Sequence, residues 1–540
     1  MSDIRAKLLE LAKLEAAQYG EAKSKSVIGK AMGKYPEFRS QAKDLMLIID
    51  EVVDEVNSLD AQELKSYIPK KQKKQEKVEV KELPPLKNSE KVVLRFAPGP
   101  SGPLHLGHTR ALALNNYYKK RYNGKLILRL EDTNPNAIDS EAYNLIPEDL
   151  TWLGIKPDET IIQSERMDIY YEAIRKIISE GGAYITKSDA EEWRELKRQK
   201  KAHPDRERPP EVQIKEFESL LSGDKGIVVI KTDLADPNPA LRDFVAFRIV
   251  TDIHPLQKTK YCLWPLYNFA VAVDDYSLGI THVLRGKDHL NNTEKQKWVY
   301  KYLNWKEPDF IHYGLVSIPK TNLKTSKIRQ SIAEGEYSGW DDCRLATIRA
   351  LERRGYSSET FSKYWENSGI KEVDIKFSWQ NFDAMNKDLI DEKSRRLFFV
   401  SEPKEFTFKS EKTIMKEAPW HPDKKELGNR EESIMSGSKI YLAGNDLSKI
   451  ENTSEIRLKN LCNVKIVGNT LEFSDFGHKK GIPIFQWCSA SREIKLYYPD
   501  GTISNGFVED NLEGLDNSVV QFERTGFVRL EGDKAFFLHR

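Results

Sequence analysis

Cysteine is scarce in this sequence. The four thiols, Cys262, Cys343, Cys462 and Cys488, stand alone among 540 residues, without a C-x-x-C pair and without a histidine at ligand spacing. A disulfide framework and a zinc knuckle both need clustered cysteines, so the sequence argues against both. We expect buried, reduced thiols and a cytoplasmic protein.

Long apolar runs and an excess of one charge are missing as well. No stretch approaches the ~18 apolar residues that a membrane-spanning helix needs, which excludes a membrane protein. The first residues, MSDIRAKLLELAKLEAAQ, lack the apolar core of a secretory signal. Lys and Arg number 85 against 83 Asp and Glu, a net charge of +2. A polyanionic partner would therefore need a local basic patch.

The sequence does have an ordinary globular composition. Hydrophobic residues make up 39% and charged residues 31% of the chain, and at roughly 150 residues per domain the length predicts about three or four domains. Residues 1–67 carry apolar side chains at three- and four-residue steps, which predicts amphipathic helices. Residues 68–90 are rich in lysine and contain two consecutive prolines, which predicts a charged linker.

A strand–loop–helix–strand pattern follows the linker. VVLRF (92–96) is a short apolar run, APGPSGPLHLGH (97–108) is a Gly/Pro loop, RALALNNYYKKRY (110–122) has helical spacing, and KLILRLED (125–132) is a second apolar run. This order predicts a parallel α/β sheet. Ligands of such sheets bind at the carboxyl ends of the strands, where this loop lies.

The loop ends in H-L-G-H, where it enters the helix. His105 and His108 are three residues apart and can face one ligand, Gly107 lets that ligand approach the backbone, and a helix N-terminus favours phosphate. Ordinary loop histidines and a zinc pair are the alternatives, although no third metal ligand is nearby. A K-T-S-K run at 324–327 supplies lysines for a pyrophosphate. Together the two segments predict a nucleoside triphosphate site.

The remaining segments differ in pattern. Residues 140–182 have helical spacing, 186–222 are charged and interrupted by proline, and 341–400 look helical again. From 401 onward, short runs such as KIYLAG and EIKLYYP alternate with Gly, Asp and Asn turns. That alternation predicts antiparallel strands and a barrel.

Several of these segments resemble a known family. RFAPGPSGPLHLGH resembles the HIGH motif of class I aminoacyl-tRNA synthetases, and LKTSKIR resembles their KMSKS loop. RLEDTNP, YNFAVAVDDYSLGITHVLRGKDH and GWDDCRLATIRALERRG are similar to the glutamyl/glutaminyl subgroup. The N-terminal helices and the strand-rich C-terminal part resemble the archaeal glutamyl branch, whereas bacterial glutamyl enzymes have a helical cage. The resemblance runs from residue 91 to the end and is weaker after 400.

The resemblance implies a multidomain α/β plus β fold. Its core is a Rossmann-like doubly wound catalytic domain with an α/β insert. The expected parts are an N-terminal helical extension (1–67), a charged linker (68–90), two Rossmann halves (91–185 and 241–330), a tRNA acceptor-end insert (186–240), a helical stem-contact domain (331–400) and an antiparallel β-barrel that binds the anticodon (401–540).

The activity implied is that of a glutamate–tRNA ligase. Such an enzyme uses ATP to convert glutamate to glutamyl-adenylate and transfers the glutamyl group to the 3′ end of tRNA(Glu). ATP is a substrate that brings Mg²⁺ with it, and no zinc is expected because the insert lacks cysteines. Glutamate and tRNA(Glu) are the expected partners, and tRNA(Gln) stays open. The N-terminal helices are candidates for binding another protein, and the chain is expected to be a monomer.

The resemblance also assigns the site residues. Three groups are expected: the catalytic residues His105, His108 and Lys327; the ATP-binding residues Gly107, Lys324, Ser326, Lys327, Asp288 and His289; and the glutamate-binding residues Arg95, Glu131, Tyr267 and Arg285. No metal ligand is expected. The sequence departs from the family pattern at Gly99, Val271, Thr325 and Ile328.

Arg285 decides between glutamate and glutamine. Glutaminyl relatives have a small uncharged residue here, and a carboxylate prefers a guanidinium partner, whereas a carboxamide needs no full charge. Arg95 and Arg285 together therefore favour glutamate. The alternative is that Arg285 simply pairs with Asp274, Asp275 or Asp288.

Three other functions remain open on the sequence alone. One is a glutamine–tRNA ligase, another is a small-ligand nucleotidyltransferase that shares the H-x-G-H loop, and the third is an RNA-binding protein without catalysis. In the last part of the chain, Lys479, Lys480, Phe485 and Trp487 combine cations with aromatic rings, as sites for unstacked anticodon bases do. The alternative for each ring is packing in the core of a barrel, so the prediction concerns the region and not these individual residues.

Overall fold

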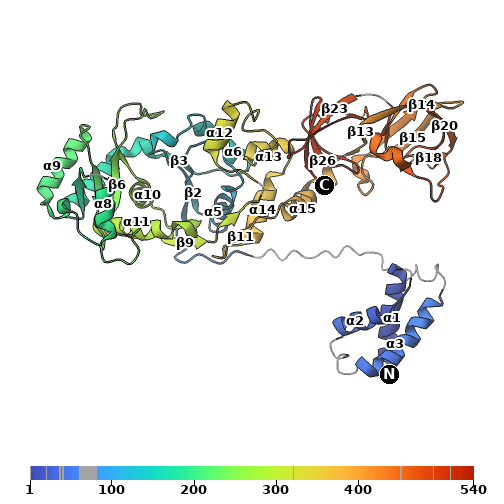
Figure 1. Cartoon of the computed structure of the whole chain (residues 1–540), viewed down its shortest axis with the longest axis horizontal. Coiled ribbons are helices and arrows are strands. Elements are labelled where there is room, and N and C mark those ends of the chain that lie inside the picture. The colour runs from blue at the N-terminus through green and yellow to red at the C-terminus, as the bar shows by residue number, and fades with distance from the viewer. Residues whose placement is uncertain are drawn as a thin grey trace. The chain divides into compact units, whose positions relative to one another are not determined.

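The computed structural model divides the chain into two compact units, Met1–Val80 and Lys81–Arg540. It describes residues 2–19, 21–35, 38, 42–59, 82–188, 190–319, 321–449, 453–489, 492–510 and 512–540. Most of the expected linker, 68–90, lies outside these residues. Figure 1 shows the elements of both units with their labels.

The first unit is helical. Its helices are α1 (Ser2–Tyr19), α2 (Ser24–Lys34) and α3 (Ala42–Asn57). Their apolar faces form one core that includes Leu8, Val27 and Ile49, each fully buried. The apolar spacing thus predicted these helices, because each presents one stripe of side chains to the others.

A parallel sheet lies at the centre of the second unit. Strands β1 (Val93–Phe96), β2 (Lys125–Leu130) and β3 (Glu159–Ile162) pair in parallel, as do β8 (His282–Gly286) and β9 (Asp309–Tyr313). The N–H of Thr281 donates to the carbonyl of Val93 at 3.0 Å. Strand β8 therefore lies beside β1, and the order is β3-β2-β1-β8-β9. Chain order reverses between β1 and β8, which is where such sheets bind ligands.

Helices connect the strands of this sheet. They are α5 (Thr109–Arg121) after β1, α6 (Ala142–Trp152) before β3, α7 (Met167–Ser179) after β3, α10 (Tyr267–Ser277) before β8 and α11 (Leu290–Leu303) between β8 and β9. Strand β1 is buried at all four positions. Burial of the strands explains why their sequences read as continuous apolar runs.

An antiparallel sheet is inserted between β3 and β8. It consists of β4 (Ala183–Thr186), β5 (Ile227–Ile230), β6 (Phe244–Ile249) and β7 (Leu263–Pro265), with helices α8 (Ala190–Arg198) and α9 (Pro210–Leu221), green in Figure 1. The sequence places a boundary after residue 240, but the sheet continues to Pro265. The reason is backbone pairing: β6 hydrogen-bonds to β5 and β7, not to the parallel sheet.

A helical segment follows the parallel sheet. It contains α12 (Thr325–Ala333), α13 (Ile348–Arg354), α14 (Ser358–Ser368) and α15 (Trp379–Ile390), and a short parallel pair joins β10 (Val316–Ser317) to β11 (Ile375–Lys376). The indole N–H of Trp365 donates to Thr109 Oγ1 at 2.7 Å, which fixes α14 against the start of α5. No helix among the described residues is long and apolar enough to cross a membrane.

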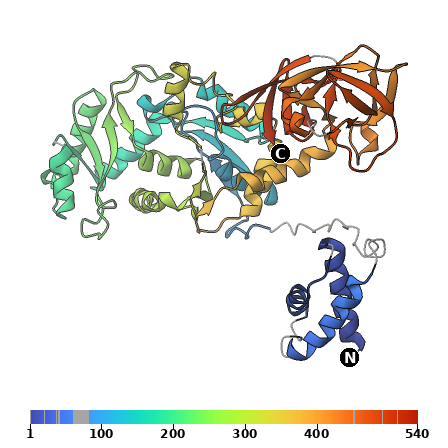
Figure 2. The same ribbon diagram turned by 45° about the vertical axis from the view of Figure 1, so that its right-hand side comes forward.

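The last part of the chain is strand-rich, orange to red in Figure 2, and forms two seven-stranded sheets, mostly antiparallel. In one sheet β12 and β13, separated only by Phe398, form opposite edges, and in the other β21 and β22, separated only by Gln486, do the same. Each sheet must therefore curl until its edges nearly meet, as in a barrel. The strands are β12 (Arg396–Leu397), β13 (Phe399–Ser401), β14 (Pro403–Lys409), β15 (Ile414–Pro419), β16 (Asn429–Ile434), β17 (Lys439–Ala443), β18 (Glu455–Leu458), β19 (Asn463–Val467), β20 (Thr470–Asp475), β21 (Ile484–Phe485), β22 (Trp487–Cys488), β23 (Arg492–Tyr497), β24 (Ile503–Val508), β25 (Val519–Phe522), β26 (Gly526–Glu531) and β27 (Lys534–His539), of which β15 and β16 form a separate hairpin.

Candidate active site

A cavity of about 280 Å³ lies at the carboxyl ends of β1 and β8. The loop 97–108 forms one side of it, and the start of α10 forms another. Seven of the predicted residues line it: Arg95, Gly107, His108, Glu131, Tyr267, Arg285 and His289. The fold thus brings together side chains that are up to 194 positions apart in the sequence.

The two histidines of H-L-G-H are held as neutral hydrogen-bond donors. Their rings stack with centroids 3.7 Å apart. The N–H of Gly107 donates to Nδ1 of His105 at 3.1 Å, and the N–H of His105 donates to Nδ1 of His108 at 3.2 Å. Because each Nδ1 accepts, the proton of each neutral ring lies on Nε2. Burial lowers the pKa of His105 to about 4, and burial together with His105 lowers the pKa of His108 well below its ordinary value.

The absence of a side chain at Gly107 leaves room for the stacked rings of the two histidines as well as for a ligand. A Cβ at this position would lie 2.9 Å from Cε1 of His105, closer than real Cβ contacts. Two backbone hydrogen bonds also hold the loop against the segment 346–348. The N–H of Leu106 donates to the carbonyl of Ala346 at 3.0 Å, and the N–H of Ile348 donates to the carbonyl of Leu104 at 2.9 Å. A segment of the helical region therefore sets the position of the histidine rings.

The K-T-S-K segment contacts the same loop. The hydroxyl of Thr325, the first residue of α12, lies 2.9 Å from that of Ser101. The N–H of Lys327 donates to the carbonyl of Lys324 at 3.0 Å as the helix begins. The side chains of Lys324, Ser326 and Lys327 are exposed. The segment thus places two exposed lysines, without an ion-pair partner among the described residues, beside the loop that carries the histidines.

Buried charges surround the inner end of the cavity. The guanidinium of Arg129 donates to Asp275 at 2.5 Å and to Glu131 at 2.9 Å, and Nε of Arg95 lies 3.4 Å from the same oxygen of Asp275. Burial raises the pKa of Glu131, and Arg129 and Arg95 oppose that shift without cancelling it. Burial works against ionisation of Asp275 too, but Arg129 and Arg95 outweigh it and lower its pKa.

Arg285 has no carboxylate partner among the described residues. Its guanidinium donates to the hydroxyl of Thr293 at 2.5 Å and to the amide oxygen of Gln296 at 2.9 Å, and Nε and Nη1 have no hydrogen-bond partner in the described part of the chain. Burial lowers its pKa. None of the three aspartates that the sequence offered as alternatives forms an ion pair with it among the described residues. A buried cation of this kind calls for an anionic ligand.

The charges of the cluster do not cancel. With all groups ionised, four guanidinium groups and three carboxylates leave a net charge of +1. Glutamate, with two carboxylates and one ammonium, has a net charge of −1, whereas glutamine has none. The groups are Arg95, Arg129, Arg166 and Arg285 against Glu131, Asp274 and Asp275.

Besides the K-T-S-K segment, two predicted residues, His105 and Asp288, are not part of the cavity lining. His105 lies next to the lining, with its ring stacked on that of His108. Asp288 is exposed and is absent from the cavity lining, and it meets His289 only at 3.9 Å. His289 does line the cavity, with Nδ1 3.3 Å from the hydroxyl of Tyr267. Gly99 lies on the lining, and Val271 is fully buried behind it. The nucleotide set predicted from the sequence thus divides into residues of the cavity, an exposed lysine pair and an exposed aspartate.

The predicted aromatic residues of the last region are buried. Phe485 and Trp487 are 1% and 2% exposed and belong to a barrel core, so they offer no free ring for a base. Lys479 forms ion pairs with Glu455 at 2.6 Å and with Asp475 at 2.7 Å. Gln486 and Cys488 are buried as well, so the whole segment 485–488, which contains the end of β21 and all of β22, lies in the interior.

Arg129 is the residue that the motifs did not identify. It is completely buried, yet it joins Glu131 to Asp275. The sequence does contain a signal for it: an arginine within the apolar run KLILRL has to find buried partners. What the sequence could not provide is the identity of those partners, because Asp275 follows 146 residues later.

The chain is similar to proteins of known activity. Two family models match it: tRNA synthetases class I (E and Q), catalytic domain, over residues 91–392, and the anti-codon binding domain of the same class over residues 394–475. It is 43% identical to a glutamate–tRNA ligase of Thermoplasma volcanium over 98% of both chains. It is 44% identical to one of Methanocaldococcus jannaschii over 97% of both chains. A glutamate–tRNA synthetase structure from Elizabethkingia anophelis has 23% identity and a TM-score of 0.40, over 56% of this chain and 71% of that chain.

The buried histidine predicts a pH dependence of stability. The pKa of His105 is about 4 in the folded protein and roughly 6.5 in an unfolded chain. Between these values the unfolded chain binds more protons, so stability falls as the pH drops through this window. We expect the midpoint of urea unfolding to depend less steeply on pH between these two values in His105→Gln than in the unchanged protein. An equal change of slope in His478→Gln, at an exposed position, would contradict burial as the cause.

Proposed function

Because the chain belongs to the class I tRNA synthetases for glutamate and glutamine, we propose that it is a glutamate–tRNA ligase whose active site is the cavity at the ends of β1 and β8. It is an aminoacyl-tRNA ligase: it consumes ATP, releases AMP and pyrophosphate, and joins glutamate to the 3′ end of tRNA. The observation that supports glutamate most directly is the buried guanidinium of Arg285, which has only neutral partners.

In this proposal the substrate completes the charge of the site. The side-chain carboxylate of glutamate lies between Arg95 and Arg285, and its α-ammonium faces Glu131. Ammonium binding offsets the effect of burial, which raises the pKa of Glu131. Glutamine would leave the guanidinium of Arg285 without an anion, which a buried site penalises. The selection is therefore electrostatic.

Activation of glutamate requires no general base. A carboxylate is already a nucleophile: its oxygen forms a bond to the α-phosphorus of ATP while the bond to pyrophosphate breaks. The protein has to align the two substrates and stabilise the negative charge that develops on the phosphates. The Nε2–H groups of His105 and His108 and the ammonium of Lys327, with support from Lys324 and Ser326, supply those donors. A ribose hydroxyl of the terminal tRNA adenosine then attacks the glutamyl carbonyl, and AMP leaves.

The nucleotide brings its own metal. In the described residues no group of three His, Cys, Asp or Glu side chains lies close enough to hold a metal ion. Mg²⁺ enters as part of the MgATP substrate, where it would share the charge of the phosphates. The insert and the C-terminal barrels are proposed to bind the acceptor end and the anticodon of the tRNA.

The deciding experiment is aminoacylation of tRNA(Glu) and tRNA(Gln) transcripts with labelled glutamate and labelled glutamine. We expect glutamate on tRNA(Glu) and no charging with glutamine, and we expect weak pyrophosphate exchange without tRNA. Glutamate on tRNA(Gln) as well would identify a non-discriminating enzyme. Charging with glutamine but not with glutamate would refute the role given to Arg285.

Arg285→Gln is expected to raise KM for glutamate roughly 100-fold, because it removes a buried charge-assisted bond worth about 3 kcal/mol. The KM for ATP should change little, and Arg285→Lys should recover only part of the loss because a lysine lacks the planar fork. The matched control is Lys301→Gln, a loss of charge on the exposed face of α11. Equal effects on both KM values would point to a general loss of structure instead.

Lys327→Ala tests the phosphate contact. We expect kcat to fall roughly 100-fold with KM for glutamate nearly unchanged, since the charge that Lys327 stabilises develops in the transition state. Gln330→Ala, one turn further along the exposed side of α12, is the control. An unchanged rate in Lys327→Ala would show that this ammonium is not a phosphate ligand.

A further inference from the structure

Asp132 is a buried carboxylate next to Glu131, and the reaction described above does not use it. Its side chain is 0% exposed and is absent from the cavity lining, whereas Glu131 belongs to that lining. The carboxylate accepts from the N–H of Ser164 at 2.8 Å and from its hydroxyl at 2.7 Å. The hydroxyl of Tyr143 donates to it as well, at 2.7 Å. A carboxylate needs such donors when it is buried, and together they fix its position.

His254 supplies a further donor, and this one comes from the insert. The residue lies in the connection between β6 and β7, and its fully buried ring stacks on that of Trp264 with centroids 4.9 Å apart. Its Nδ1 accepts from the N–H groups of Leu256 and Gln257, each at 3.1 Å. The proton of the ring therefore lies on Nε2. This Nε2 is 3.0 Å from the carbonyl oxygen of Asp132 and 3.4 Å from its Oδ2.

The insert contacts the same segment at a second point. Arg248 of β6 donates to the side-chain oxygen of Asn134 at 2.9 Å. The connection between β6 and β7 is closed by two backbone hydrogen bonds: the N–H of His254 donates to the carbonyl of Lys258 at 3.1 Å, and the reverse bond is 2.9 Å long. The insert therefore holds, at two points, the segment that follows Glu131.

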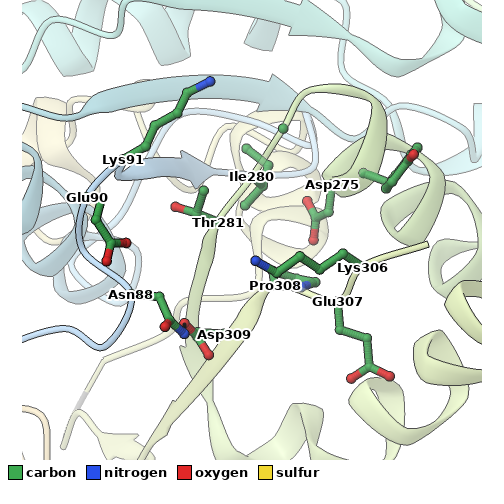
Figure 3. Close-up of a pocket in the computed structure, with 12 residues that line it drawn as sticks. Asn88, Glu90, Lys91, Asp275, Ile280, Thr281, Lys306, Glu307, Pro308 and Asp309 are labelled. Atoms are coloured by element: carbon green, nitrogen blue, oxygen red, sulfur yellow. Dashed lines mark hydrogen bonds between the residues drawn. The ribbon is translucent and has the colours of Figure 1, made fainter.

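Glu131 is also held from the side of the parallel sheet. Its N–H donates to the carbonyl of Pro98 at 3.0 Å, and its carboxylate accepts from Arg129 at 2.9 Å. Arg129 donates in turn to Asp275, which Figure 3 shows beside Ile280. A carboxylate that is already in place loses less freedom when it binds an ammonium group. The affinity for that group therefore depends on the contacts from both sides.

We propose that Asp132 and His254 are positioning residues for glutamate: they hold Glu131 where its carboxylate meets the α-ammonium of the substrate. Through them the insert affects the affinity of a cavity to which none of its described residues contributes lining. This inference rests on the proposed function, because it takes glutamate as the ligand of the cavity. It adds two residues that act on the substrate only through Glu131.

The ammonium contact is isolated by comparing glutamate with glutarate, which is the same molecule without the ammonium group. The Kd of each ligand is measured by calorimetry on the full chain at equal ionic strength, without ATP. The ratio of the Kd of glutarate to that of glutamate then reports on the contact with Glu131. Loss of positioning lowers this ratio, whereas a general weakening of the cavity raises both Kd values and leaves the ratio unchanged.

Two substitutions of His254 separate the roles of its two nitrogens. A glutamine reaches the position of Nε2 and can still donate to Asp132, whereas an asparagine reaches only the position of Nδ1 and keeps the acceptor for the backbone of the connection. We expect His254→Asn to lower the ratio roughly tenfold, the size of one buried hydrogen bond, and His254→Gln to recover most of it. An unchanged ratio in both variants, or a larger loss in His254→Gln, would overturn the proposal.

Tyr143→Phe tests Asp132 from the other side with almost no change of volume. It removes one hydroxyl donor to the carboxylate, so we expect a folded protein whose ratio is roughly threefold lower. Tyr302→Phe is the matched control, because it removes a hydroxyl that donates to the carbonyl of Lys231 at 3.0 Å, outside this network. Urea midpoints of both variants report their stability separately. An equal fall of the ratio in Tyr302→Phe would contradict a specific role of Asp132.

Failure of this inference and failure of the proposed function give different results. Charging of tRNA(Glu) with glutamate by the unchanged protein tests the function and does not involve these variants. If that charging occurs but the ratio of Kd values is the same in all variants, the function stands and the positioning role is refuted. If the unchanged protein neither charges tRNA nor binds glutamate, both are refuted.

Discussion

The proposed active site depends on positive charge that the protein buries without fully compensating it. Arg95, Arg129 and Arg285 lie at the ends of neighbouring parallel strands, at most 5% exposed. Two carboxylates are shared among them, and Arg285 has only neutral partners. An unpaired buried charge costs several kcal/mol. A ligand with an acidic side chain removes that cost, so affinity and selection for glutamate have the same physical origin.

The second constraint is the position of the loop that carries the histidines. Strand β1 delivers it to the edge of the sheet, backbone bonds from the segment around Ala346 hold one side, and Thr325 of α12 contacts the other. Burial keeps both imidazoles neutral, with Nε2 as donor. Neutral donors that are already oriented need no reorganisation when charge develops on a phosphate. The chemistry thus depends on packing between segments far apart in sequence.

Asp275 links helix α10 to the guanidinium groups at the strand ends. Its carboxylate lies on α10, two turns beyond Tyr267, and anchors two of the three guanidinium groups. Its other oxygen is buried and has no hydrogen-bond partner among the described residues. A change of charge near Asp275 alters the electrostatic potential at both of these guanidinium groups, because the interior screens charges weakly.

Local sequence patterns determined the strand–loop–helix order and the H-L-G-H and K-T-S-K segments, because spacing and turn chemistry act over a few residues. The choice of Arg285 came from the family resemblance and stays a prediction. Tertiary structure alone decided the rest. Pairing of β6 with β5 extended the insert to Pro265, and the inner face of a barrel buried Phe485 and Trp487. The bond from Arg129 to Asp275 likewise spans 146 residues, a distance at which only chain folding chooses partners.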